Sequence, residues 1–346
     1  MEKIKLTQYS RGAGCGCKIP PKELDEILKS GIVPLQNDRL IVGNNTRDDA
    51  AVYDLGNGTG LISTTDFFMP IVDDPFEFGK IAAANSISDV YAMGGTPLMA
   101  IAILGWPIGK LALELAREVL EGGRSICVEA GIPLAGGHSI DSLEPVFGLA
   151  VNGIISLADL KKNNTAEDGN LIYLTKPLGT GILTIAEKRG LLKDEHIGIA
   201  LGQMAQLNKI GTKLSKLKGV KAMTDVTGFG LLGHLIEMAE GSGLSAEIQY
   251  SKIPLLAVIH HYTSKMCVPD NTFRNWNGYE TKVTGITSES LLTLCDPQTN
   301  GGLLIAVDPR ERKPFEAILI EQGLKEFIEP IGFFKSPLGE IYVEIA

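Results

Sequence analysis

The sequence predicts two successive units that mix strands and helices, of α/β or α+β class. Strand-like and helix-like patterns alternate up to about residue 155, which is typical of such a unit. The stretch Leu160–Asn170 is charged and polar and predicts a boundary, after which a second alternation begins. A length of 346 residues suits one large domain or two ordinary ones.

The first unit follows an N-terminal arm and begins with a helix over Lys22–Ser30. A hairpin comes next, since Asn57-Gly58 is a strong turn signal between two apolar runs. If that pair is the centre of the turn, Asp49 and Asp66 face each other at the open end. The remaining elements alternate helix and strand: a helix over Phe76–Met93, a buried strand over Leu98–Leu104, a helix over Leu111–Ala130, and strands over Leu134–Ser139 and Val146–Ile155.

The second unit repeats the mixture of elements. We expect strands over Leu171–Thr175 and Leu303–Val307, and helices over Ile182–Arg189, Gln203–Leu217 and Leu231–Ala239. The predicted organisation is therefore an arm over residues 1–20, an N-terminal domain over 21–157 and a C-terminal domain over 158–346.

Composition excludes several classes of protein. A net charge of −9 argues against a nucleic-acid partner, which would favour a basic face. Five cysteines in a long chain do not suggest a disulfide framework and fit a reducing cytoplasm. The first residues lack the apolar core of a signal peptide. Residues 90–109 are uncharged, but their four glycines and two prolines predict a broken run rather than a membrane helix.

The arm contains a cluster of reactive groups in Gly12-Ala-Gly-Cys-Gly-Cys-Lys18. A neighbouring cation lowers a thiol pKa, and glycines allow close approach to a ligand. We expect a loop that brings a reactive sulfur to an anion. Two alternatives stay open. One is a loose terminus with incidental cysteines; the other is a soft-metal site of Cys15 and Cys17 with His260, His261 or Cys267.

Acidic residues form the stronger pattern. Several aspartates stand beside Gly, Ser, Thr or Asn, mostly at the ends of elements, and such carboxylates suit Mg²⁺ that bridges to phosphates. Structural helix caps are the alternative for most of them. Asp89 differs because it lies inside an apolar helix, where Asn85 alone does not neutralise it. The candidates are Asp48, Asp49, Asp66, Asp89 and Asp225.

The chain has no Gly-x-x-x-x-Gly-Lys-Ser/Thr motif, so it is not a P-loop protein and would have to bind phosphate in another way. Backbone N–H groups of Gly136-Gly-His-Ser139 and Gly228-Phe-Gly230 could cradle phosphate instead. His138 is more often a structural residue than a catalyst. The residues thus predict a Mg²⁺-assisted phosphate enzyme that carries a reactive thiol on its arm.

Seven motifs resemble those of the selenophosphate synthetase (selenide, water dikinase) family. The resemblance runs nearly end to end, and the Gly-Cys-Gly-Cys-Lys arm separates that family from its superfamily relatives. The motifs are Thr7-Gln-Tyr-Ser, Gly12-Ala-Gly-Cys-Gly-Cys-Lys18, Thr46-Arg-Asp-Asp49, Thr64-Thr-Asp66-Phe-Phe, Ser86-Ile-Ser-Asp89-Val-Tyr-Ala-Met-Gly-Gly-Thr-Pro, Gly136-Gly-His-Ser139 and Thr224-Asp225-Val-Thr-Gly-Phe-Gly.

The resemblance implies an aminoimidazole ribonucleotide synthetase-like fold, with an N-terminal α/β domain that binds ATP and Mg²⁺ and a C-terminal α+β domain. It implies a homodimer that joins sheets into a barrel. The implied reaction makes selenophosphate, AMP and orthophosphate from ATP, water and selenide, and so supplies selenoprotein and selenium-modified tRNA synthesis. A selenium-delivery protein is a further possible partner. Nucleic acid and membrane are not expected as partners.

The resemblance also assigns roles to residues. Cys15 matches the catalytic cysteine or selenocysteine, and Lys18 matches the essential lysine, which reaches the phosphates. Asp49, Asp89 and Asp225 match ligands of several Mg²⁺ ions. The remaining ATP contacts would be Thr46, Arg47, Asp48, Asp66, Asp89, Gly137, His138 and Ser139. Alternatives are an ADP-forming small-molecule kinase, an ATP-dependent cyclo-ligase, or a thiol-based selenium or metal carrier.

Overall fold

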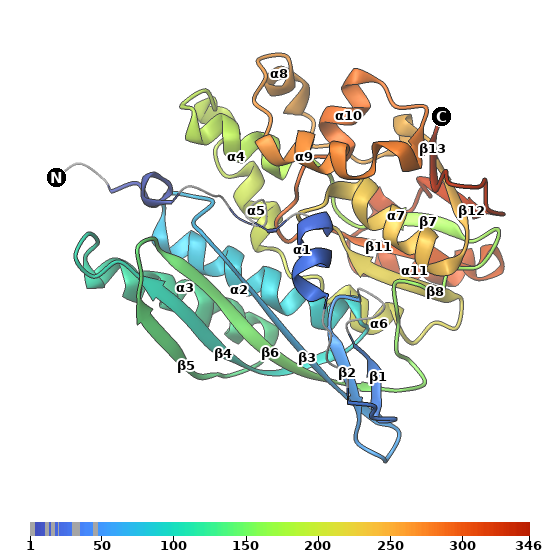
Figure 1. Cartoon of the computed structure of the whole chain (residues 1–346), viewed down its shortest axis with the longest axis horizontal. Helices are drawn as coiled ribbons and strands as arrows, with labels where there is room; N and C mark the ends of the chain where they lie inside the picture. Colours follow the sequence, from blue (N-terminus) through green and yellow to red (C-terminus); the bar gives the residue numbers. More distant parts are fainter. Residues whose placement is uncertain (1–3, 11–13, 15–17, 20, 30–34, 44–47) are drawn as a thin grey trace.

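The computed structural model describes residues 4–10, 14, 18–19, 21–29, 35–43 and 48–346 (Figure 1). Within this part of the chain, a central helix, α2 (Pro75–Ala92), contacts three strands of one sheet and the edge strand of another. The first sheet ends at Ser156 and the second begins at Leu171. The predicted domain boundary near residue 157 therefore falls in the connection between them.

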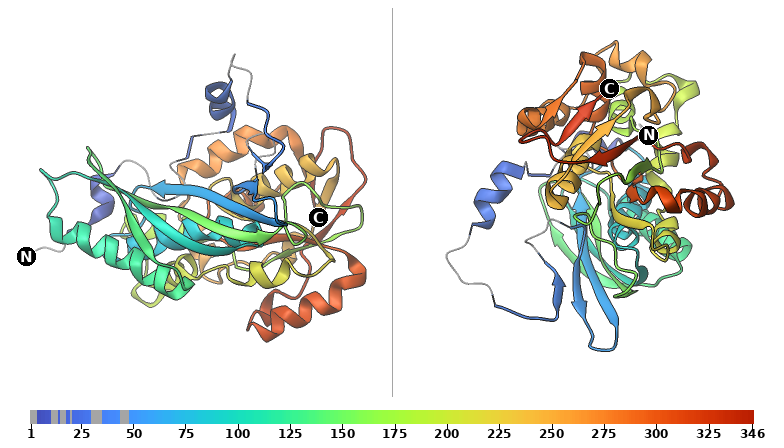
Figure 2. Two further views of the ribbon diagram at one scale, coloured as in Figure 1. Left: turned by 90° about the horizontal axis from the view of Figure 1, so that it is seen from below. Right: turned by 90° about the vertical axis from the view of Figure 1, so that its right-hand side faces the viewer.

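The first sheet has six strands within the described residues, in the order β1-β2-β3-β6-β4-β5. Neighbouring strands are antiparallel except β4 and β5, which are parallel. Helices α2 and α3 (Leu113–Ala130) pack on one face, and the left-hand view of Figure 2 shows the strands on the outside of the molecule. The strand bounds are Leu40–Val42, Ala51–Asp54, Thr59–Phe68, Thr96–Trp106, Leu134–Asp141 and Val146–Ser156 for β1 to β6.

The second sheet has seven strands among the described residues, in the order β10-β13-β9-β12-β7-β11-β8. Apolar residues of its strands alternate between two cores, one under α7 and the other under α6 and α11. The strand bounds are Leu171–Leu174 (β7), Val220–Asp225 (β8), Ser245–Ile248 (β9), Val283–Thr284 (β10), Leu303–Val307 (β11), Gly332–Lys335 (β12) and Val343–Ile345 (β13). The helices outside the first sheet are α1 (Pro21–Leu28), α4 (Thr180–Lys188), α5 (Ile199–Ala205), α6 (Ile210–Leu214), α7 (Gly230–Ser242), α8 (Ile259–Thr263), α9 (Asp270–Tyr279), α10 (Ser288–Leu294) and α11 (Arg312–Glu321).

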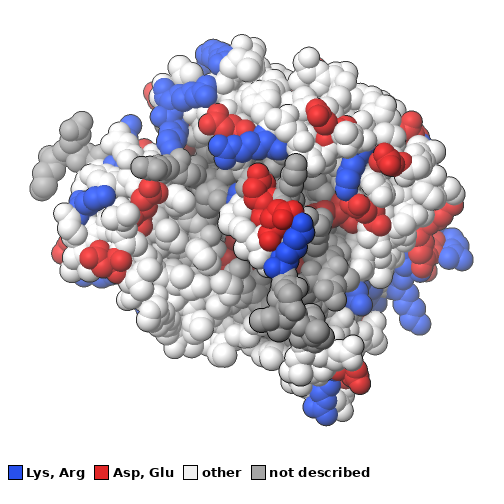
Figure 3. Space-filling view, viewed as in Figure 1, with Lys and Arg blue, Asp and Glu red and all other residues white. Residues whose placement is uncertain are grey.

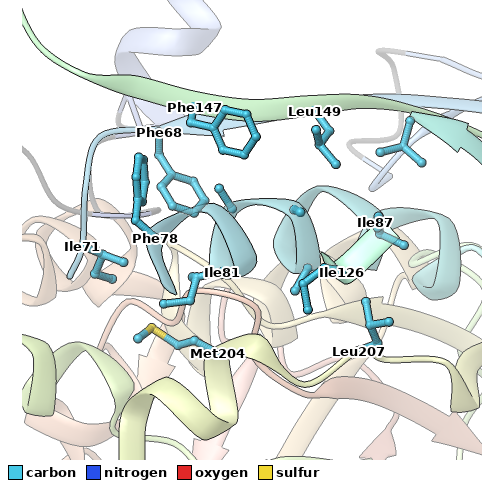
Figure 4. Close-up of a cluster of buried hydrophobic side chains, with 14 of the residues drawn as sticks. Phe68, Ile71, Phe78, Ile81, Ile87, Ile126, Phe147, Leu149, Met204 and Leu207 are labelled. Atoms are coloured by element: carbon cyan, nitrogen blue, oxygen red, sulfur yellow. The ribbon is translucent and has the colours of Figure 1, made fainter. Parts of the chain in front are cut away.

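Helix α2 is buried on nearly every side because both halves of the chain pack against it. Its N-terminus is well defined, since the Asp74 carboxylate accepts a hydrogen bond from the Glu77 amide at 3.1 Å and Pro75 takes the first position. Figure 4 shows Phe147 and Leu149 of the first sheet on one side of the helix and Met204 and Leu207 on the other. One core thus crosses the predicted domain boundary.

The predicted hairpin exists, but the predicted pairing of Asp49 with Asp66 is wrong by one residue. The strands pair Asp54 with Gly60 and Val52 with Ile62, so the turn is centred on Asn57. The turn contains an odd number of residues between the paired strands, because Gly56 and Gly58 both adopt positive φ, at 85° and 81°. Continuing that register would place residue 65, not Asp66, opposite Asp49.

Two other expectations need correction. The predicted buried strand over Leu98–Leu104 is β4, which is exposed at Leu98, Met99 and Ile101 because the face of the sheet opposite α2 and α3 is open within the chain. The predicted helix over Gln203–Leu217 is two short helices, α5 and α6. Between them Gln206 is extended and the Asn208 side chain donates to Gly301 O at 2.9 Å, which fixes the break.

The other predicted elements are confirmed within about four residues at their ends. In the described residues, no helix has the length and apolar character that a membrane crossing needs.

Candidate active site

Three carboxylates from three distant parts of the chain meet at one point. Asp49 precedes β2, Asp89 lies in the last turns of α2, and Asp225 is the last residue of β8. One oxygen of each lies within 4.8 Å of an oxygen of the other two. The first sheet, the central helix and the second sheet each supply one acid, so only the folded chain assembles the group.

Each of these carboxylates accepts a hydrogen bond from one hydroxyl group. Thr224 Oγ1 donates to Asp49 Oδ1 at 2.7 Å. Thr64 Oγ1 donates to Asp89 Oδ2 at 2.5 Å, and Ser88 Oγ donates to Asp225 Oδ2 at 2.5 Å. Neutral hydroxyls fix the orientation of the carboxylates and leave their negative charge in place.

Burial raises the pKa of all three acids, and repulsion from neighbouring carboxylates adds to the rise. For Asp49 and Asp89, removal from water raises the pKa most, and the charge of Asp225 raises it further. For Asp225, burial raises the pKa, while the hydrogen bond from Ser88 and the charge of Lys18 oppose the rise. A cation at this point would relieve the repulsion.

The carboxylates fit a hard divalent cation such as Mg²⁺. Asp49 Oδ2 is buried and has no hydrogen-bond partner among the described residues, although it lies beside two other acids. An orphaned carboxylate oxygen in a cluster of oxygen ligands is what Mg²⁺ or a similar ion would satisfy. The described donor set therefore agrees with the predicted metal ligands, and their role stays a proposal.

A cavity of about 440 Å³ opens in front of the carboxylates. Lys18 is the one Lys or Arg among its described lining residues, and its Nζ lies 3.4 Å from Asp66 Oδ2. Asp66 in turn accepts a hydrogen bond from Asn85 Nδ2 at 2.5 Å. The polar and charged residues around the cavity are Lys18, Asp48, Asp49, Ser63, Thr64, Thr65, Asp66, Asp89, Asp225, Thr227, His234 and Glu237.

The structure places the predicted site residues in three groups. Lys18 and the five candidate aspartates line the one cavity. Gly137, His138 and Ser139 lie on β5 at the opposite edge of the first sheet from β1, are exposed, and are not among the residues lining the cavity. Cys15, Thr46 and Arg47 lie outside the described residues, as does Cys17.

The phosphate-binding expectation for Gly228–Gly230 is corrected in part. The Gly230 N–H donates to Thr227 O at 3.0 Å, so a turn at the start of α7 uses this amide internally. Thr227 and Phe229 nevertheless are among the residues that line the cavity.

Sequence reasoning missed His234 and Glu237, which bring α7 to the cavity wall. His234 Nε2 accepts a hydrogen bond from Thr227 N at 3.0 Å, and its Nδ1 lies 3.7 Å from Glu237 Oε2. Burial lowers the pKa of His234 to about 3, so the ring is neutral, with its proton on Nδ1. A histidine three residues before a glutamate in an otherwise apolar helix was the available signal.

The fold and the site define a class of protein with two AIR synthase-like domains. The family model for the AIR synthase related protein, N-terminal domain, matches residues 47–155, and that for the C-terminal domain matches residues 167–333. The crystal structure of thiamine-monophosphate kinase from Stenotrophomonas maltophilia K279a is similar, with a TM-score of 0.66 at 16% identity over 90% of this chain and 92% of that chain. Hydrogenase maturation protein HypE in complex with ATP has a TM-score of 0.63 at 19% identity over 90% and 87%.

Closer relatives narrow the class to one family. The selenide, water dikinase of Aeromonas salmonicida (strain A449) is 56% identical over 345 residues, which cover 100% of this chain and 99% of the relative. That of Colwellia psychrerythraea (strain 34H) is 59% identical over 332 residues, 96% of each chain. The chain belongs to the selenide, water dikinase family.

Proposed function

We propose that this protein makes selenophosphate from ATP, selenide and water, and releases AMP and orthophosphate. In the first step a bond forms between selenium and the γ-phosphorus, the bond from that phosphorus to the bridging oxygen breaks, and ADP stays bound. In the second step water attacks the β-phosphorus and AMP leaves. The observation that carries the proposal is the three-carboxylate cluster facing Lys18 in one cavity, in a chain of this family.

Asp49, Asp89 and Asp225 would hold the Mg²⁺ ions, because they present acidic oxygens within 4.8 Å of one another, and such oxygens are the ligands Mg²⁺ prefers. When bound, these ions screen the triphosphate and stabilise the charge on the transferred phosphoryl group. An acidic cavity would otherwise repel ATP.

The chain's own residues orient the reactants. Lys18 supplies a point charge to the phosphates, and Asp66 holds its ammonium toward the cavity. Thr64, Ser88 and Thr224 fix the three carboxylates through their hydroxyls. We assign to Cys15 the handling of selenium, because a thiolate is a soft nucleophile that matches a soft atom. Thr46, Arg47, Asp48, Asp66 and Asp89 are the proposed ATP contacts of the same chain.

A homodimer would complete the ATP site. Gly137, His138 and Ser139 do not line the cavity of their own chain, so a second copy is the way for them to reach ATP. The open face of the first sheet supports this arrangement, since it carries exposed Phe67, Met99, Ile101 and Ile154. Figure 3 shows that the region over β4, β5 and β6 has few charged side chains. Buried free cysteines at 127, 267 and 295 support a reducing, cytoplasmic setting.

The products of ATP turnover test the proposal. We expect ³¹P NMR of ATP, Mg²⁺, selenide and protein under anoxia to show AMP and orthophosphate in equal amounts, with an additional phosphorus signal that is absent when selenide is left out. ADP as the main end product would contradict the dikinase reaction and favour a simple kinase. ATP turnover with the same rate and products in the absence of selenide would show that selenide is not a substrate.

A further inference from the structure

The N-terminal arm is fastened to the body of the protein at a first point, the short 3₁₀ helix η1 (Leu6–Tyr9). Leu6 is fully buried and belongs to the core around α2. The Thr7 backbone N and Oγ1 both donate to Asp73 Oδ1, at 3.2 and 2.5 Å. Two hydrogen bonds to one carboxylate, with a buried apolar neighbour, make a fixed attachment rather than a surface contact.

A second attachment lies seven residues further on, at Gly14. Its N–H donates to Met69 O at 3.1 Å, and its φ is +50°. A Cβ at this position would come within 2.4 Å of Ile71 Cδ1 and 2.6 Å of Thr299 Oγ1. A larger residue here would therefore be strained by the positive φ and would displace the side chains of Ile71 and Thr299.

Both attachments use the same connection, residues 69–74, which joins two elements of the active site. The connection follows β3, which carries Asp66, and it ends at Asp74, which caps α2, the helix of Asp89. Lys18 comes four residues after Gly14, so its Cα can lie no more than about 14 Å from that of Gly14. The attachment of Gly14 thus limits how far Lys18 can move from Asp66. In the structure, Lys18 Nζ lies 3.4 Å from Asp66 Oδ2.

We propose that Thr7, Asp73 and Gly14 are positioning residues for phosphoryl transfer. They hold the arm against residues 69–74 at two points ahead of Lys18, and so they deliver Lys18 to the cavity in a restricted range of positions. Restricting a catalytic group in this way raises its effective concentration. The inference rests on the proposed function of Lys18, and it gives the Thr7-Gln-Tyr-Ser motif a role.

The test compares three variants by two readouts, tryptic cleavage after Arg11 under native conditions and kcat for ATP turnover. Thr7→Val removes the hydroxyl at nearly constant shape, Thr7→Ser keeps it, and Gly14→Ala adds the clashing Cβ. Loss of a hydrogen bond to a charged group weakens the attachment by about tenfold or more. We therefore expect Thr7→Val and Gly14→Ala to be cleaved at least fivefold faster and to lose at least tenfold in kcat. Thr7→Ser should resemble the wild type in both.

Controls separate positioning from folding and from the role of Lys18. Gly58→Ala places the same methyl group at positive φ in open space, so it should leave both readouts unchanged. The thermal midpoint of Thr7→Val should stay within about 2 °C of the wild type. If Lys18→Ala keeps full activity, the proposed function of Lys18 fails, while the cleavage rates still report the attachments. Wild-type cleavage in Thr7→Val, or faster cleavage at unchanged kcat, overturns the positioning role.

Discussion

At the scale of single residues, four polar side chains lie among apolar neighbours in the C-terminal half of α2, at positions 85, 86, 88 and 89, and each has its own partner. Asn85 donates to Asp66, and Ser86 Oγ accepts from Leu149 N at 3.1 Å. Ser88 donates to Asp225, and Asp89 accepts from Thr64. A polar group inside a core is tolerated when it is hydrogen-bonded, so these positions are specified by neighbours from other elements.

The raised pKa values of Asp49, Asp89 and Asp225 predict how pH and Mg²⁺ affect stability. A carboxyl whose folded pKa lies above its unfolded value binds a proton more tightly in the folded state. Stability of the metal-free protein therefore falls as pH rises from about 4 through the raised pKa values. Mg²⁺ needs the ionised acids, and at a hundred times its Kd it would stabilise the fold by about 2.7 kcal/mol.

We expect the increase in thermal midpoint with MgCl₂ to be large at pH 8 and small at pH 5, as measured by calorimetry with and without EDTA. In Asp89→Asn the increase should shrink at pH 8, and Mg²⁺-dependent ATP turnover should drop at least a hundredfold, because one ligand charge is lost. An increase with Mg²⁺ that is equal at both pH values, or full activity of the variant, would show that the cluster does not hold the metal.

At the scale of elements, the loop 296–302 connects α2 to the C-terminal half. Asn300 has a positive φ of 49°, and its N–H donates to Asn85 Oδ1 at 2.7 Å. Its Nδ2 donates to Met204 O and Gln206 O at 2.6 and 2.9 Å, while Lys176 Nζ donates to Asn300 O at 2.8 Å. The loop therefore holds Asn85, which in turn holds Asp66 at the cavity.

Asn300→Ala should destabilise the protein by about 2–4 kcal/mol, because it removes two buried hydrogen bonds and places alanine at positive φ. Urea unfolding followed by circular dichroism gives this value. Asn277→Ala, at an exposed position of α9, is the control and should change stability by less than about 0.5 kcal/mol. Equal changes in the free energy of unfolding for the two substitutions would mean that the hydrogen bonds of Asn300 do not stabilise the fold.

At the scale of the whole molecule, the first sheet is covered on one face and open on the other. α2 and α3 bury the inner face, whereas Phe67, Ile101 and Ile154 are between 36% and 51% exposed on the outer one. A contiguous apolar face of this kind is typical of a surface that associates with another protein. The same face lies beside β5, which carries His138.

Ile101→Asp should convert the proposed dimer to a monomer in size-exclusion chromatography with light scattering, because burying an unpaired charge costs several kcal/mol. ATP turnover should fall with it, since the second copy would no longer supply residues 137–139. Ile320→Asp changes a side chain of α11 that is 49% exposed, and it should leave the dimer intact. A wild-type monomer at micromolar concentration would contradict the proposed assembly.

Local patterns in the sequence determined most of the elements and the chemical character of the site. Apolar spacing, Asn57-Gly58, Gly94-Gly95 and the proline signals located helices and strands, since these depend on neighbours a few residues apart. The placement of aspartates beside small polar residues predicted a cation site, and the structure brings three of them together. The isolated carboxyl of Asp89 within an apolar helix indicated that a partner must come from elsewhere in the chain.

Tertiary structure alone decided which residues meet. Asp49, Asp89 and Asp225 converge because the first sheet and the edge strand β8 of the second both pack against α2, and no sequence spacing encodes that contact. The one-residue error in the hairpin arose because two glycines at positive φ lengthen the turn. Long-range packing also brought His234 to the cavity and carried β5 away from it. Such contacts depend on burial of whole faces of elements, which a local pattern does not specify.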